Sequence, residues 1–209
     1  DHFINVADAM RDQYLAAGIG QADDYTRIPS GFNLQPFLEA ENSPAKRESL
    51  GLSPGDFVVG KIARLFELKG HDDLFDIAPR LARRIPNIRF LLVGDGVWRG
   101  RFERLAKQIG CEQNFLFTGL VPPAEIPSLI GVMDALVHLS RREGLPRALP
   151  QAMAAAKPVV AFNCDGAGEV CLDEKTGYLI EPGDLLKLEE SLAKLANDAP
   201  LRTALGQAG

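Results

Sequence analysis

The feature that most constrains the fold of this chain is its regular alternation of short, mostly apolar segments with helical segments. Seven segments have the apolar character of buried strands, namely 3–6, 57–64, 88–94, 115–119, 135–140, 158–162 and 177–181. Helical patterns lie at 70–84, 97–109, 123–131, 146–156 and 184–198. Strands that are apolar on nearly every residue are typical of a parallel sheet covered by helices on both faces. The sequence therefore predicts an α/β fold with a doubly wound, Rossmann-like parallel sheet and a ligand crevice beyond the carboxyl ends of its strands.

Residues 25–55 interrupt this alternation. They contain four prolines and three glycines, a composition that predicts a hinge or linker. Residues 1–24 are expected to be the end of a preceding domain or a crossover segment, and residues 56–209 form the main domain. The chain opens on a strand pattern without an initiating methionine and stops just past a helical pattern, so we expect it to be a piece of a longer protein.

Composition narrows the range of functions. The 209 residues carry a net charge of −5, so the chain has no electrostatic footprint for nucleic acid. These residues contain no secretory h-region and no apolar run near 18 residues, so no segment among them is expected to span a membrane. Contact with the inner face of a membrane through another part of the protein stays open. Three cysteines lack metal-ligand spacing and leave one unpaired in any disulfide scheme, which favours a reducing cytoplasm.

The glycine-rich segment GDGVWRG at 94–100 raises the question of a dinucleotide site. Its third glycine comes one place late, and the next strand, at 115–119, does not end in the acid that would hold a ribose hydroxyl. A tight strand-to-helix turn is therefore predicted in place of an NAD site. His138 lies in a buried strand pattern and is predicted to be a satisfied core histidine, not a base.

Two cations follow the apolar core of the strand at 57–64. Arg64 ends this strand, and Lys69 stands five residues later. A guanidinium can hold phosphate oxygens in a bidentate manner and an ammonium adds a point charge, so the pair could neutralise a diphosphate leaving group without a metal. The same composition also fits two solvated surface charges, with Lys69 supporting the turn into the next helix.

A second group of polar residues follows the strand at 135–140. Gly144 permits close backbone approach, and Pro146 suits the first turn of a helix whose free N–H groups would attract an anion. Glu143 would accept hydrogen bonds from sugar hydroxyls, with Gln151 roughly 8–12 Å away. The alternative is a capping carboxylate and an exposed amide.

The helix predicted at 146–156 has two further features. Arg147 and Gln151 are four residues apart and would share a face. Pro150 lacks an N–H group and should bend or delay the helix. The glycine turn at 162–170 could face the same crevice or be a plain loop.

Taken in order, these segments resemble the carboxyl-terminal, donor-binding half of a family 4 retaining glycosyltransferase with the GT-B fold. The resemblance rests on INVADAMRDQYLAAGI, RIPSGFNLQPF, VVGKIARLFELKG, FLLVGDGVWRGRFERLA, FLFTGLVPPAEIPSLIGVMDALVHLSRREGLPRALPQAMAAAKPVVAF and EKTGYLIEPGD. It implies hexosyl transfer from a UDP-, GDP- or ADP-linked sugar to a glycan, lipid or small-molecule acceptor, with retention of configuration and without a metal or other cofactor. It also implies a role in cell-envelope glycan synthesis, with 56–209 as the nucleotide-sugar-binding domain.

The resemblance gives catalytic roles to three residues: Arg64 and Lys69 would clamp the diphosphate, and Glu143 would touch the donor sugar. Seven further residues are predicted to bind the donor: Gly119, Val121, Gly144, Leu145, Pro146, Arg147 and Gln151. Among these, the amides of residues 144–146 would cradle the sugar and phosphate, and Val121 would line the base pocket.

Gln151 departs from the family pattern, because the family has a ribose-binding glutamate at this position. Its amide keeps an acceptor oxygen but loses the charge-assisted hydrogen bond, so donor affinity is expected to fall while the site survives. Ser30 in place of asparagine and Ala156 in place of glycine are smaller departures. A non-catalytic sugar-nucleotide-binding protein and a GT-B sugar-nucleotide epimerase remain alternatives. The chain alone is expected to have negligible transfer activity.

Overall fold

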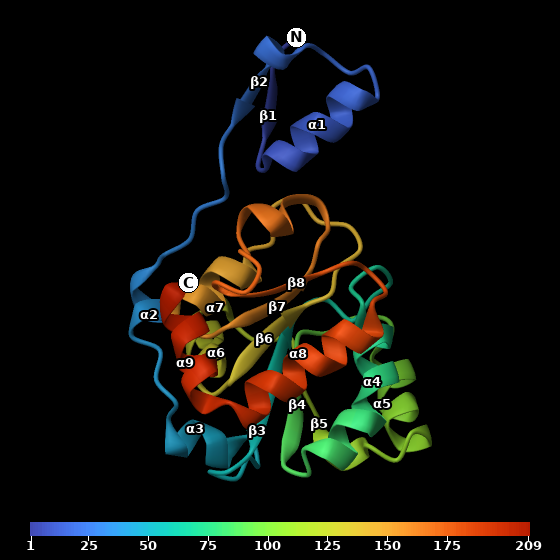
Figure 1. Cartoon of the computed structure of the whole chain (residues 1–209), viewed down its shortest axis with the longest axis vertical. Helices are drawn as coiled ribbons and strands as arrows, with labels where there is room; N and C mark the ends of the chain where they lie inside the picture. The colour runs from blue at the N-terminus through green and yellow to red at the C-terminus, as the bar shows by residue number, and fades with distance from the viewer.

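A six-stranded, fully parallel sheet forms the centre of the computed structural model, which describes residues 1–209 (Figure 1). The strands are β3 (Phe57–Ile62), β4 (Ile88–Val93), β5 (Phe115–Gly119), β6 (Ala135–His138), β7 (Val159–Phe162) and β8 (Gly177–Ile180). Each begins and ends within two residues of a predicted strand. The doubly wound α/β fold predicted from the apolar runs is therefore confirmed.

Helices cover both faces of this sheet, and each face has its own apolar core. The helices of this part are α4 (His71–Arg84), α5 (Arg99–Gln108), α6 (Ile126–Gly131), α7 (Ala148–Ala154), α8 (Leu185–Asn197) and α9 (Ala199–Ala208). Successive residues of β3 point to opposite faces, so Val59 joins one core and Val58 the other. Buried residues of α4, α5 and α8 belong to the first core, and those of α6 and α7 to the second.

The strand order places a ligand crevice at a defined point. The sheet runs β5-β4-β3-β6-β7-β8, so the chain winds outward in one direction from β3 and in the other from β6. The connections that leave the carboxyl ends of β3 and β6 therefore diverge and leave a crevice between them. The loops that follow these two neighbouring strands carry Arg64, Lys69 and Glu143.

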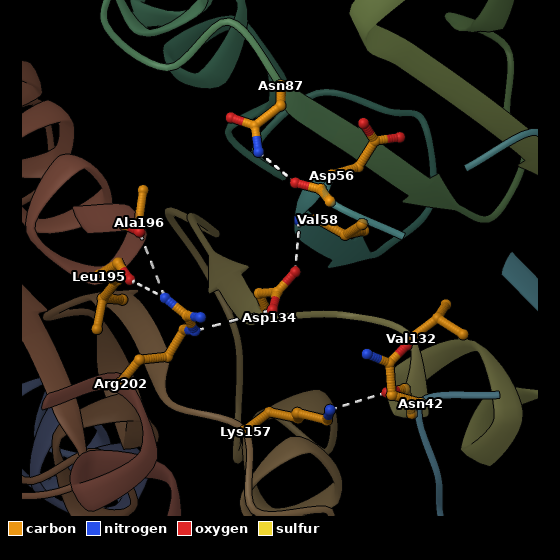
Figure 2. Close-up of polar contacts among 12 residues, drawn as sticks. Asn42, Asp56, Val58, Asn87, Val132, Asp134, Lys157, Leu195, Ala196 and Arg202 are labelled. Atoms are coloured by element: carbon orange, nitrogen blue, oxygen red, sulfur yellow. Dashed lines mark hydrogen bonds and ion pairs between the residues drawn. The ribbon is translucent and has the colours of Figure 1, made fainter. Parts of the chain in front are cut away.

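Polar contacts fasten the opposite, amino end of the sheet (Figure 2). The Asp134 carboxylate accepts a hydrogen bond of 2.8 Å from the N–H of Val58, and it lies 3.8 Å from the guanidinium of Arg202. Arg202 also donates to the carbonyl of Leu195 at 2.5 Å. The Lys157 ammonium donates to the carbonyl of Gly131 at 2.8 Å. Because Arg202 lies on α9, these bonds tie the last helix to the start of β6.

The first 27 residues form a small separate layer (Figure 1). Strands β1 (Phe3–Asn5) and β2 (Tyr25–Arg27) pair in parallel, with α1 (Asp8–Ala16) between them in sequence. The connecting segment contains α2 (Gln35–Leu38) and α3 (Pro44–Ser49), neither of which was predicted. Single turns of 3-10 helix are η1 (Ala22–Asp24), η2 (Glu112–Asn114), η3 (Pro123–Glu125) and η4 (Asp165–Glu169).

The start of α7 differs from the prediction. The helix begins at Ala148, two residues later than expected, so Pro146 lies before it. Pro150 is consequently the third helical residue, where a backbone N–H would have no acceptor within the helix. The proline delays the helix without breaking one of its hydrogen bonds.

Candidate functional site

A cleft of about 550 Å³ lies beyond the carboxyl ends of β3 and β6, at the predicted crevice. It is lined by Ile62, Ala63, Arg64, Lys69, Val121, Pro123, Ile126, His138, Ser140, Glu143, Leu145, Pro146, Arg147, Ala148 and Gln151. Eight of the ten predicted site residues are in this set, and Gly119 and Gly144 are not. Residues that are 87 positions apart in sequence, Arg64 and Gln151, thus border one cavity.

The turn at 94–98 fixes the loop that carries Arg64. The N–H of Leu65 donates to the carbonyl of Asp95, and that of Ala63 to the carbonyl of Val93, both at 3.0 Å. A Cβ atom on Gly94 would lie 2.3 Å from the Ala63 carbonyl oxygen, and one on Gly96 as close to that of Leu65. The glycines of GDGVWRG therefore allow two loops to pack together, as the turn interpretation predicted.

A tight backbone segment places Lys69 at the end of β6. Leu68 has φ 65° and Gly70 has φ 63°, so two of three consecutive residues are left-handed. A Cβ atom on Gly70 would lie 1.9 Å from the carbonyl oxygen of Leu139, which makes glycine necessary there. The ammonium of Lys69 reaches the Glu143 carboxylate at 2.6 Å, with both side chains partly buried. Lys69 was interpreted either as a diphosphate-binding cation or as a solvated surface charge, and the partly buried ion pair does not fit the second interpretation.

Asp165 holds the backbone of Glu143, and it was not identified from the sequence. Its carboxylate accepts hydrogen bonds of 2.6 Å from the N–H of Glu143 and from the side-chain amide of Gln13 on α1. Burial alone would raise the pKa of Asp165, but these two hydrogen bonds, a third from Cys164 and the positive charge of Arg142 together lower it. Asp165 has φ 48°, a conformation that costs a non-glycine residue free energy.

The segment after Glu143 offers free backbone donors. The N–H groups of Gly144 and Leu145 donate to no acceptor within the chain. Pro146 has no N–H, so the expectation that the amides of residues 144–146 cradle a ligand is wrong for this residue, which can contribute only its ring and carbonyl. Gly144 borders a second hollow of about 340 Å³, which also contacts α1 and shares Glu143 with the cleft.

The far end of the cleft carries Val121, Arg147 and Gln151. Arg147 and Gln151 both line the cleft, so they share a face as predicted. The side chain of Gln151 makes no hydrogen bond within the chain, and Arg147 is exposed and forms no ion pair. Gly119 lies behind this wall, where its carbonyl accepts a hydrogen bond from Gly94 at 3.1 Å.

His138 differs from its prediction as a satisfied core histidine. It is 6% exposed, yet its Nε2 atom has no hydrogen-bond partner and lies 3.9 Å from the Glu143 carboxylate. The Oγ atom of Ser140 is also buried without a partner. Burial, helped by Lys61 and Lys69, lowers the pKa of His138 to about 3, so the ring is neutral at physiological pH. The prediction was right that His138 is buried and wrong that both its ring nitrogens have hydrogen-bond partners, because the strand ends at the cleft.

Lys61 lies in β3 beneath the cleft and is 1% exposed. Burial lowers its pKa to about 7, and attraction to Asp73 only partly offsets this. The polar groups behind the cleft therefore contain a lysine that titrates near neutrality.

The fold defines a Rossmann-like domain with a cleft at the switch point of a parallel sheet. Residues 42–209 match the family model described as glycosyl transferases group 1. Because this match covers most of the chain, the protein belongs to this glycosyltransferase family.

Named relatives agree with this assignment. The chain is 30% identical over 203 residues to a GDP-mannose-dependent alpha-(1-6)-phosphatidylinositol monomannoside mannosyltransferase of Mycolicibacterium smegmatis, covering 93% of this chain and 53% of the relative. It is 32% identical over 176 residues to a 2-deoxystreptamine glucosyltransferase of Streptomyces kanamyceticus, covering 79% of this chain and 44% of the relative. The chain thus spans about half the length of the curated relatives it matches.

Solved structures show the same architecture. The crystal structure of Anabaena HepE in complex with UDP-glucose superimposes with a TM-score of 0.87 at 27% identity, covering 99% of this chain and 57% of that one. The carboxyl-terminal domain of a group 1 glycosyl transferase from Francisella tularensis gives a TM-score of 0.76 at 26% identity, covering 85% and 94%. None of the helices has both the length and the apolar character needed to cross a membrane.

Proposed function

We propose that this chain is the donor-binding part of a retaining glycosyltransferase that takes a sugar from a nucleoside diphosphate sugar. The observation that carries this proposal is the convergence of Arg64, Lys69 and Glu143 on one cleft in a member of a glycosyltransferase family. The HepE structures with UDP and UDP-glucose support a nucleotide sugar as the ligand class. The acceptor, a glycan, lipid or small molecule, would also contact residues outside this chain.

The charges of the cleft suggest how the residues divide the work. Arg64 forms no ion pair within the chain and would hold the diphosphate, with Lys69 as a second cation. The free N–H groups of Gly144 and Leu145 would bind oxygens of the sugar or phosphate. These groups would stabilise negative charge on the departing diphosphate without a resident metal. Glu143, fixed through its backbone by Asp165, would accept hydrogen bonds from the sugar.

Binding of sugar nucleotides to this chain tests the proposal. We expect isothermal titration calorimetry to detect binding of UDP-glucose or GDP-mannose, and a thermal-shift screen that includes an ADP-sugar to rank the bases. Arg64→Ala should weaken the bound donor by about tenfold or more, because a charge-assisted hydrogen bond contributes about 1.5–3 kcal/mol. Arg83→Ala is the matched control, since Arg83 is exposed on α4 away from the cleft. An Arg64→Ala variant that binds the donor as tightly as Arg83→Ala would contradict the proposed binding of the diphosphate by Arg64.

Gln151 provides a second test at the nucleoside end. We propose that its amide contacts the ribose, with Val121 beside the base. Gln151→Glu should tighten donor binding severalfold, because a carboxylate forms hydrogen bonds about twice as strong as those of an amide. Unchanged affinity in calorimetry would remove the ribose role.

Gln151 also favours a second candidate, a non-catalytic sugar-nucleotide-binding protein. The full-length protein separates the two functions. Transfer that retains the anomeric configuration, persists in EDTA and is lost in Glu143→Ala would support the enzyme. A full-length protein that binds donor but transfers no sugar would support the binding protein.

A further inference from the structure

Two buried polar atoms without partners lie at the bottom of the cleft. Six buried side-chain nitrogen or oxygen atoms of the chain have no hydrogen-bond partner. They belong to five residues, of which only His138 and Ser140 line the cleft. Folded proteins rarely leave such atoms unsatisfied, because each costs about 1–3 kcal/mol. A ligand in the cleft could satisfy both.

The surroundings of His138 point to a hydroxyl-bearing ligand. Its Nε2 atom lies 3.9 Å from the Glu143 carboxylate, which also accepts from Lys69 at 2.6 Å. The imidazole is neutral and can donate from one nitrogen, whereas the carboxylate can only accept. A hydroxyl both donates and accepts, so two neighbouring hydroxyls on one ring can contact the imidazole and the carboxylate together. The diphosphate of a sugar nucleotide, which is fully ionised and has no proton to donate, would be repelled by the carboxylate.

We propose that His138, assisted by Ser140, contacts hydroxyls of the transferred sugar and helps to determine which sugar the cleft accepts. This inference rests on the proposed function and deepens it. Glu143 and His138 would then form a two-point contact with a pair of ring hydroxyls, and the Ser140 hydroxyl a third contact. The nucleoside diphosphate part of the donor would bind elsewhere in the cleft, along Arg64 and Gln151.

The test compares sugar nucleotides with the same nucleotides lacking the sugar. Calorimetry on this chain would measure UDP-glucose against UDP, and GDP-mannose against GDP. His138→Leu should lower the affinity for the sugar nucleotide by about tenfold and leave the affinity for the nucleoside diphosphate unchanged, because one buried hydrogen bond to the sugar is lost. His138→Gln should restore part of the loss, since its amide can donate. Ser140→Ala should have the same selectivity with a smaller loss.

His71→Leu is the matched control. His71 is also buried with both ring nitrogens unpartnered, but it packs on Phe102 and does not line the cleft. It should leave both affinities unchanged. The melting temperature of His138→Leu should not fall, because the substitution removes an unsatisfied buried nitrogen.

Four outcomes would overturn the inference. Equal weakening of sugar nucleotide and nucleoside diphosphate would show that His138 acts on the shape of the cleft. A lower melting temperature without selective loss of the sugar nucleotide would show a structural role. Unchanged binding in His138→Leu, with a wild-type chain that binds, would contradict this inference alone. A wild-type chain that binds neither sugar nucleotide would contradict the proposed function and this inference together.

Discussion

A buried arginine at the amino end of the central sheet and a buried histidine at its carboxyl end differ in how their polar atoms are bonded. At the amino end, Arg47 is buried and donates to the carbonyls of Ser53, Asp56 and Val132. At the carboxyl end, His138 and Ser140 keep unpartnered buried atoms. The contrast indicates that Arg47 stabilises the fold, whereas His138 and Ser140 have hydrogen-bonding atoms that a ligand could use. Local rules of structure are broken where a ligand is expected to bind.

Acid should destabilise the chain through buried histidines at the carboxyl end of the sheet, and this is the largest effect we expect. Burial lowers the pKa of His71 to about 2 and of His138 to about 3. The unfolded chain therefore takes up protons on these two histidines below pH 6.5 that the folded chain resists, so their contribution to stability is full above pH 6.5 and falls toward pH 3. Each group contributes a slope of up to about 1.4 kcal/mol per pH unit. The free energy of unfolding, measured with urea across this pH range, should depend less on pH in the His71→Leu/His138→Leu double variant than in the wild-type chain. An equal dependence on pH in both would refute the assignment.

Removal of Arg47 should break the amino end. Arg47→Met keeps the apolar stem but leaves the carbonyls of Asp56 and Val132 without a donor, so we expect the free energy of unfolding to fall by about 3 kcal/mol. Arg101→Met serves as control, because its ion pair with Asp72 is exposed and contributes less than about 1 kcal/mol. Donor affinity should be unchanged in both. Urea denaturation that gives equal losses for the two variants would show that the buried arginine has no special role.

Asp165 tests the carboxyl end with less risk to the fold. Asp165→Gly relieves the left-handed backbone but removes the acceptor of the Glu143 N–H. We expect faster amide exchange at Glu143 and a donor affinity lower by severalfold. Glu174→Gly relieves a similar φ of 58° on a surface turn away from the cleft and should change neither quantity. Identical exchange rates for the Glu143 amide in the two variants would mean that Asp165 does not position this residue.

Ala156 gives the smallest expected effect. It has φ 53° just after α7, and the N–H groups of Ala156 and Lys157 donate back to Met153 and Ala152, as in a Schellman motif. Ala156→Gly should therefore stabilise the chain by about 0.5–1 kcal/mol. Ala155→Gly, one residue earlier with an ordinary negative φ of −90°, should instead destabilise it. Thermal unfolding that ranks the two substitutions in the reverse order would contradict this account.

The strands of the central sheet and the larger helices were predictable because each lies in an apolar or periodic run. The elements α2, α3 and β2 were not, because they lie in a segment rich in proline and glycine that interrupts this pattern. In the site, Arg64, Lys69, Glu143 and Gln151 follow motif patterns that can be found in sequence. Asp165 and the orphaned nitrogen of His138 depend on contacts between distant segments, which no local pattern reports.

The ion pair between Lys69 and Glu143 has a consequence for an empty cleft. Any anion that approaches Lys69 must compete with a carboxylate already 2.6 Å away. Inorganic phosphate can pair with Lys69, but as an anion it would be repelled by the Glu143 carboxylate that it separates from the ion pair. A sugar nucleotide brings hydroxyls for Glu143 together with phosphates for Lys69. In the empty cleft, Lys69 and Glu143 thus take the place of each other's ligand groups. Only a ligand that has both phosphates and hydroxyls can separate them and give each a new partner.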